Sequence, residues 1–134
     1  VADTSAGRDI ESVRDLESSG VLVVLCASSA PCGAATDALL GGLDLDVDAA
    51  SREPNVRATL TKVRLGEADA AIVYRTDALA SPELRAVPIA QADNVQVISQ
   101  AAAVGGRDNA LRVLQVLTEP AAVAILAEAG FGSP

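Results

Sequence analysis

The sequence lacks histidine, methionine and tryptophan, and its only aromatic residues are Tyr74 and Phe131. Without histidine, neither a Ser-His-Asp nor a Cys-His catalytic arrangement can be built. The two cysteines are too few for a zinc site in a chain without histidine. Cys32 could be a thiol activated by a helix N-terminus, but no partner for proton transfer is apparent nearby. We therefore predict that the protein is not an enzyme.

Positive charge and long apolar runs are also scarce. Ten basic residues stand against eighteen acidic ones, which gives a formal net charge of −8. Binding to nucleic acid or to anionic lipid needs clustered Lys and Arg, so the charge balance argues against both. No apolar stretch reaches the roughly 18 residues of a membrane span, and no signal peptide or anchor segment is recognisable. We expect a partner that is neither a nucleic acid nor a lipid surface.

What the sequence has in abundance is small and branched aliphatic residues. Half of the chain is hydrophobic, and almost all of that half is Ala, Val, Leu and Ile. Branched residues suit strands, and faces rich in Ala and Leu suit helices, so this composition is typical of a layered α/β fold. The length of 134 residues allows one ordinary compact domain.

Continuous apolar runs predict the strands. The runs at 21–25 and 70–74 are typical of strands that are buried on both faces. The segment 84–89 predicts a third strand, and its Pro88 favours an edge position. Residues 95–104 alternate weakly and predict a longer strand or a connector. The acidic segment 44–54 shows no periodicity and is expected to be irregular.

Capping residues and apolar stripes predict the helices. A short helix is expected after Ser12, and a second over 34–40 with Pro31 in its first turn and Gly41-Gly42 ending it. Asn55 is a good N-cap for the next helix. Two further helices are predicted near the C-terminus, one capped by Asn109 and the other opening at Thr118-Glu119-Pro120. The former carries an apolar stripe of Leu111, Leu114 and Leu117.

Cys26 and Cys32 flank the predicted loop between the first strand and the helix at 34–40. Two interpretations of this spacing are open. The two residues could close a local disulfide, which would suit an oxidising compartment. They could equally be two reduced, buried, small hydrophobic residues.

Two predicted helix N-termini could bind an anion. A helix N-terminus offers unpaired N–H groups and a partial positive charge, and these occur at Cys32-Gly33 and at Asn55-Val56. Gly33 would let a ligand approach the backbone closely. Tyr74 ends a predicted strand, where ligands of open α/β sheets gather. Ordinary capping is the alternative explanation for both N-termini, and an amphipathic aromatic at the sheet rim is the alternative for Tyr74.

Three segments together resemble the periplasmic molybdate-binding proteins of ABC importers. These are VLVVLCASSAPCG at 21–33, NVRATLTKVRLGEADAAIVYRTD at 55–77 and ILAEAGFG at 125–132. The central segment is the most specific, with Asn-Val-Arg, an amphipathic helix, Gly-Glu-Ala, an apolar strand and then Tyr74. The resemblance covers the chain from about Ile10 onward, in the order and with the spacing of the family.

The resemblance implies a two-lobed periplasmic-binding-protein fold of type II, in which the chain leaves the first lobe, forms the second and returns. Residues 1–90 are then expected to be an α/β domain equivalent to the second lobe. Residues 91–134 would be the returning strand and the two C-terminal helices of the first-lobe portion. The N-terminal part of the family, with two serine-bearing loops that complete the oxyanion shell, has no counterpart in this chain.

The resemblance also implies a ligand and its donors. The family holds a tetrahedral oxyanion with hydroxyl and backbone N–H groups, so molybdate or tungstate is the expected ligand, with no cofactor and no directly bound metal. The positions that match are Cys32 and Val56, through their backbone N–H groups, and Tyr74, through its hydroxyl. In a protein exported to an oxidising space, we also expect Cys26 and Cys32 to lie within disulfide distance.

The expected function is solute capture outside the cytoplasm and delivery to the membrane permease of an ABC importer. The alternative is a stand-alone half-domain that acts as an interaction or regulatory module and is dimeric. Self-association through residues 109–129 would fit it, because the stripe of Leu111, Leu114 and Leu117 needs a covering surface. We expect residues 1–90 or a second copy to cover these leucines.

Overall fold

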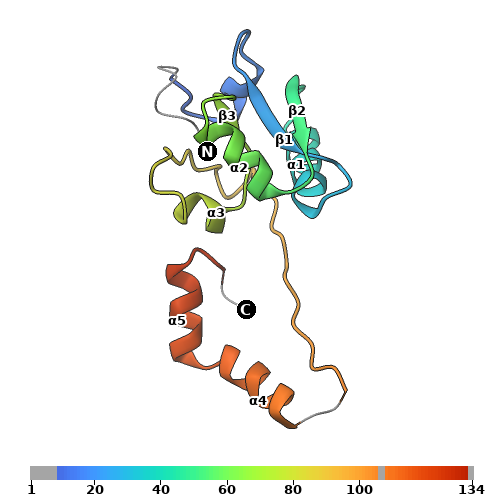
Figure 1. The fold of residues 1–134 in the computed structure, drawn as a ribbon, viewed down its shortest axis with the longest axis vertical. Helices are drawn as coiled ribbons and strands as arrows, with labels where there is room; N and C mark the ends of the chain where they lie inside the picture. The colour runs from blue at the N-terminus through green and yellow to red at the C-terminus, as the bar shows by residue number, and fades with distance from the viewer. Residues whose placement is uncertain (1–8, 106–107, 133–134) are drawn as a thin grey trace. The chain divides into compact units, whose positions relative to one another are not determined.

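The computed structural model describes residues 9–105 and 108–132, and the chain divides into two compact units, Val1–Gln96 and Val97–Pro134. The sequence had placed this division after residue 90. The first unit contains a sheet of three parallel strands, β1 (Val23–Cys26), β2 (Ala49–Glu53) and β3 (Ala70–Ala71), in the order β2-β1-β3 (Figure 1). This α/β unit with a small parallel sheet agrees with the predicted fold class.

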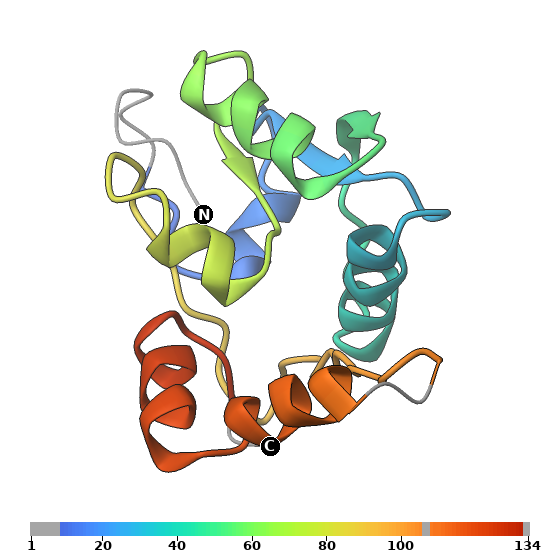
Figure 2. The same ribbon diagram turned by 60° about the horizontal axis from the view of Figure 1, so that its bottom comes forward.

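Two helices connect the strands and cover different faces of the sheet. α1 (Pro31–Gly42) links β1 to β2, and α2 (Val56–Arg64) links β2 to β3. Successive residues of a strand point to opposite faces. Val23 and Leu25 accordingly pack in one apolar cluster with Leu40 of α1, whereas Val24 packs in another with Leu60 of α2. Figure 2 shows α1 and α2 on separate sides of the sheet.

The strands differ from the prediction in several places. The first is confirmed but shifted, since it begins at Val23, and the predicted strand 70–74 is paired only at Ala70–Ala71. The predicted strand 84–89 is wrong, because Arg85 forms a single β-bridge and Val87 and Ile89 pack on the core without ladder pairing. Residues 95–104 contain no strand and correspond to the connector that the sequence also allowed. β2, in contrast, forms inside the segment expected to be irregular.

The helices of the first unit follow the predicted caps more closely. Ser12 precedes a 3₁₀-helix, η1 (Val13–Glu17), which buries Leu16. α2 begins as predicted, because the Asn55 side chain accepts a hydrogen bond from the Ala58 N–H at 3.0 Å. α1 is longer than predicted and includes Gly41 and Gly42 in its last turn. A short helix, α3 (Arg75–Leu79), was not predicted.

The second unit contains two helices, α4 (Asp108–Leu117) and α5 (Pro120–Glu128). Because α4 begins at Asp108, the prediction of Asn109 as its N-cap is wrong. Neither helix contains a buried residue, and Leu111 and Leu117 are 49% and 41% exposed. That residues 1–90 or a second copy cover this stripe stays a prediction. No single helix within the described ranges is long and apolar enough to cross a bilayer. Only α4 and α5 together, with a bend of 61°, reach that length and composition.

Candidate functional site

Three helices of the first unit begin at the same edge of the sheet. Because β1, β2 and β3 are parallel, their carboxyl ends lie at one edge, and each strand is followed by a helix, α1, α2 and α3 in turn. Ligands of open α/β sheets bind outside this edge. The topology therefore gathers the starts of three helices where a ligand is most often found.

The three residues predicted as ligands meet in one cluster at this edge. Cys26, Ala30 and Cys32 form a small buried core, and Val56 and Tyr74 pack against it. Cys32 lies in the first turn of α1, Val56 is the first residue of α2, and Tyr74 immediately precedes α3. Residues separated by more than forty positions are thus neighbours, as an oxyanion site built from them requires. Their role as ligands stays a prediction.

A disulfide closes the loop between β1 and α1. The sulfur atoms of Cys26 and Cys32 are bonded at 2.07 Å, and the two Cα atoms are 5.8 Å apart. Cys26 is fully buried and Cys32 is nearly so. Of the two interpretations that the spacing left open, the structure has the disulfide. Cys32 consequently has no thiol with which to act as a nucleophile.

Gly33 plays a different part from the one the sequence suggested. A Cβ atom at this position would lie 1.9 Å from the carbonyl oxygen of Ala27 and 2.4 Å from its carbonyl carbon. The space that a side chain at position 33 would occupy is therefore filled by the backbone of the loop itself. The absent side chain lets the first turn of α1 pack directly on the loop that the disulfide closes.

Backbone donors at the starts of α1 and α2 are unpaired. Within residues 9–105 and 108–132, the N–H groups of Cys32 and Gly33 donate to no acceptor, and neither do those of Val56 and Arg57. These are the orphan donors that every helix N-terminus leaves. With the positive end of the helix dipole, they give this edge the partial charge that suits an anion although the chain is acidic.

The Tyr74 hydroxyl is held in its donor form. Tyr74 is half-buried, and its backbone is extended at the residue before α3 rather than inside the predicted strand. Burial, and next the charge of Asp77, raise the pKa of its phenol. A tyrosine hydroxyl is protonated at neutral pH already at its ordinary pKa, and the raised pKa extends this hydrogen-bond-donating form to higher pH.

Asp77 is a feature of the site that the sequence reasoning missed. Burial raises the pKa of its carboxyl group, and the nearby Arg57 acts in the opposite direction. Asp77 is close enough to Tyr74 for its charge to act on the phenol. The signal in the sequence was its place three residues after Tyr74, which becomes informative once α3 is known to begin at Arg75. A carboxylate here disfavours a bound anion whenever it is ionised.

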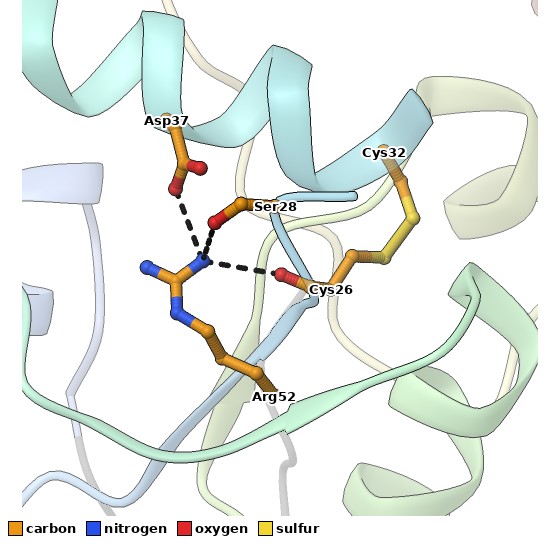
Figure 3. A network of polar contacts seen from close by, with 5 residues as sticks. All are labelled: Cys26, Ser28, Cys32, Asp37 and Arg52. Carbon is orange, nitrogen blue, oxygen red and sulfur yellow. Dashed lines mark hydrogen bonds and ion pairs between the residues drawn. A yellow bond between two sulfur atoms is a disulfide. The ribbon is translucent and has the colours of Figure 1, made fainter. Parts of the chain in front are cut away.

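Arg52 is the second missed residue. Its guanidinium contacts the carbonyl oxygen of Cys26 and the side chains of Ser28 and Asp37 (Figure 3). It lies on β2, in a segment where no strand was expected, so nothing in the sequence placed it beside the disulfide loop. In the part of the chain that the structure describes, no group of three or more His, Cys, Asp or Glu side chains could hold a metal ion.

Comparison with known proteins gives relatives of one kind. A protein named molybdate-binding protein ModA from Mycobacterium bovis is 32% identical over 138 residues, which cover 100% of this chain and 53% of the relative. Two proteins of the same name from Mycobacterium tuberculosis match with the same identity and coverage. The chain thus spans about half the length of these relatives. Their identity confirms the resemblance that the sequence motifs indicated.

A family model agrees with these relatives over nearly the whole chain. The model for bacterial extracellular solute-binding proteins matches residues 1–132. The description of this family names the binding of solutes. The chain therefore belongs to the bacterial extracellular solute-binding proteins.

Proposed function

We propose that this chain is the molybdate- or tungstate-binding part of an ABC import system outside the cytoplasm, and that its ligand is delivered to a membrane permease. The observation that carries the proposal is the meeting of Cys32, Val56 and Tyr74 at the carboxyl edge of a parallel sheet. The names of the relatives supply the class of ligand.

The chemistry of the edge suits a tetrahedral dianion. In a dry site, several neutral donors can replace the hydration shell of an oxyanion without a basic side chain. The unpaired N–H groups of α1 and α2 and the protonated hydroxyl of Tyr74 are donors of this kind. The net charge of −8 would slow the encounter with an anion without preventing binding. The same donors would accept molybdate or tungstate.

We further propose that the first unit is equivalent to the second lobe of a two-lobed protein, and that the second unit belongs with the first lobe. The chain spans 53% of the length of its relatives, so their remaining length is enough for another lobe. The apolar residues that α4 and α5 leave exposed within their own unit support this assignment, since another lobe would cover them; they are Leu111, Val113, Val116, Leu117 and Ile125. Closure of two lobes would then complete the donor shell.

Replacing Tyr74 with Phe is expected to weaken molybdate binding by the two-lobed protein by about 1.5–3 kcal/mol, the range for a hydrogen bond to a charged group. The change removes one hydroxyl and keeps the ring that packs on the disulfide cluster. Calorimetric titration with molybdate, tungstate and sulfate measures the effect. Arg57→Ala and Arg75→Ala are the controls, because both side chains are exposed and should alter mainly the encounter rate and its salt dependence.

The Tyr74 experiment can also contradict the proposal. If Tyr74→Phe leaves the affinity unchanged while Arg75→Ala abolishes it, the anion is held by a salt bridge and the site of neutral donors is wrong. If the unchanged protein binds none of the three oxyanions, the function itself is wrong.

Replacing Asp77 with Asn is expected to strengthen molybdate binding on the order of fivefold at neutral pH, because a charge interaction of about 1 kcal/mol with the anion is removed. Burial raises the pKa of Asp77 above its ordinary value of 3.8. The carboxyl group is therefore neutral at low pH, and the affinity of the unchanged protein should fall as the pH rises through this raised pKa. Titrations across this pH range test the expectation.

The Asn variant serves as its own control for the ligand, because protonation of molybdate itself affects both proteins equally. The folding stability of the unchanged protein should fall with rising pH, as its affinity for molybdate does. A carboxyl group with a raised pKa in the folded state binds more protons there, so it lowers stability as the pH rises from 3.8 through the raised value. If the affinity for molybdate depends on pH in the same way in the unchanged protein and in Asp77→Asn, Asp77 does not act on the site.

A further inference from the structure

We infer that Arg52 is a positioning residue for the proposed oxyanion site, and that it holds the loop between β1 and α1 so that the N–H of Cys32 faces the ligand. The inference rests on the proposed function, since it names the side chain that fixes one of its donors. Arg52 itself is not proposed to touch the ligand.

One nitrogen of Arg52 joins three parts of the loop region. Its Nη1 atom lies 3.0 Å from Oδ1 of Asp37, 3.2 Å from the carbonyl oxygen of Cys26 and 3.4 Å from Oγ of Ser28. Cys26 ends β1, Ser28 lies in the loop, and Asp37 lies two turns into α1. The guanidinium thus ties the end of the strand and the loop to the helix whose first turn carries Cys32 (Figure 3).

The disulfide and Arg52 restrain the same loop from different sides. Figure 3 shows the guanidinium on one side of Cys26 and the bond to Cys32 on the other. The disulfide fixes the distance between the ends of the loop, and a single link of this kind still allows the ends to rotate. A second contact at the Cys26 carbonyl removes that freedom. Preorganised donors of this kind bind a charged ligand better than mobile ones.

The ion pair with Asp37 persists over a wide pH range. A hydrogen bond from Ser28, and then Arg52 itself, hold the pKa of Asp37 below its ordinary value. The side chains of Arg52 and Asp37 are 39% and 38% exposed, so their ion pair contributes little to stability. A loss of Arg52 should therefore change the position of the loop more than the stability of the fold.

The test compares Arg52→Gln with Lys62→Gln. Both variants lose one positive charge, and both side chains are 39% exposed and form an ion pair, but Lys62 pairs with Glu67, which is not a residue of the loop. The Kd for molybdate of the two-lobed protein is expected to rise about tenfold in Arg52→Gln and less than twofold in Lys62→Gln. The denaturation midpoints of the two variants should agree with each other.

A ligand-free measurement accompanies the titration. The N–H of Ala27 donates to the Glu53 carbonyl at 2.7 Å, and the N–H of Ala30 donates to the Ala27 carbonyl at 2.8 Å. Hydrogen exchange at these two amides in the 134-residue chain is expected to be about tenfold faster in Arg52→Gln, while the amide of Leu25 in β1 keeps its rate. Asp37→Asn leaves the contacts to Cys26 and Ser28 in place and should have a smaller effect on both measurements.

The outcomes separate this inference from the proposed function. If the unchanged protein binds molybdate and Arg52→Gln weakens binding no more than Lys62→Gln, Arg52 is not a positioning residue. The same conclusion follows if the Kd rises only in step with a loss of stability. If the unchanged protein binds no oxyanion, the proposed function fails, and equal exchange at Ala27 and Ala30 in both variants would show that Arg52 does not hold the loop either.

Discussion

Replacing Gly33 with alanine is expected to destabilise the first unit by about 3 kcal/mol, the upper part of the usual range for overpacking. The added Cβ would lie 1.9 Å from the carbonyl oxygen of Ala27, and the obstacle is backbone that the disulfide holds in place. The loop and the start of α1 must separate to admit a methyl group. Denaturant unfolding of the 134-residue chain measures the loss.

Gly41→Ala is the matched control for this substitution. Gly41 lies in the same helix, and a Cβ there would meet nothing within 4 Å. Alanine is a better helix former than glycine, so Gly41→Ala should stabilise the chain by up to about 1 kcal/mol. Opposite signs for two identical substitutions in one helix would isolate the contact with Ala27. A Gly33→Ala variant as stable as the unchanged chain would show that the loop moves aside freely.

Removing the disulfide with Cys26→Ala and Cys32→Ala together is expected to cost about 2 kcal/mol of folding stability, because so short a closed loop restrains the unfolded chain only modestly. The free energy of unfolding, measured with and without a reducing agent, gives the effect. In the double variant the reducing agent should change nothing. The proposed site should also weaken, since Cys32 would lose its covalent link to the end of β1.

Counting reactive thiols checks directly that Cys26 and Cys32 form a disulfide. Both cysteines of the described structure are bonded to one another, so the native chain should show no reactive thiol before reduction and two after it. Two thiols in the unreduced, unfolded chain would mean that Cys26 and Cys32 are the buried, reduced pair that their spacing also allowed.

Where the sequence predicted the fold correctly, a local signal was strong. Asn55 caps α2 because its side chain accepts a hydrogen bond from the Ala58 N–H. Val23–Cys26 is a strand because an unbroken apolar run has to be buried on both faces. The amphipathic helix expected after Asn55 buries Leu60 and Val63 on its inner face. Each of these elements could be recognised from fewer than ten neighbouring residues.

The incorrect strand predictions concern segments whose structure depends on pairing with distant parts of the chain, not on a local signal. β2 reads Ala-Ala-Ser-Arg-Glu, without an apolar run, and becomes a strand because β1 offers it backbone partners at the sheet edge. Segment 84–89 has the apolar residues of a strand but forms only a single β-bridge, at Arg85. For the site, motif resemblance selected Cys32, Val56 and Tyr74, which the fold then brought together. Arg52 acts across the fold and left no local pattern, whereas Asp77 lies only three residues after Tyr74 and became informative once the start of α3 was known.

The parallel register of the sheet also sets the order in which the site can be assembled. β1 pairs through Val23 with Ala49 on one side and with Ala70 on the other, so both crossovers must be complete before the sheet exists. Such non-local pairings form more slowly than helices. Tyr74 follows the last strand to join. A growing chain therefore cannot form the proposed ligand-binding edge until the residues up to Tyr74 are free to fold, and under the proposed function a ligand could be captured only after that point.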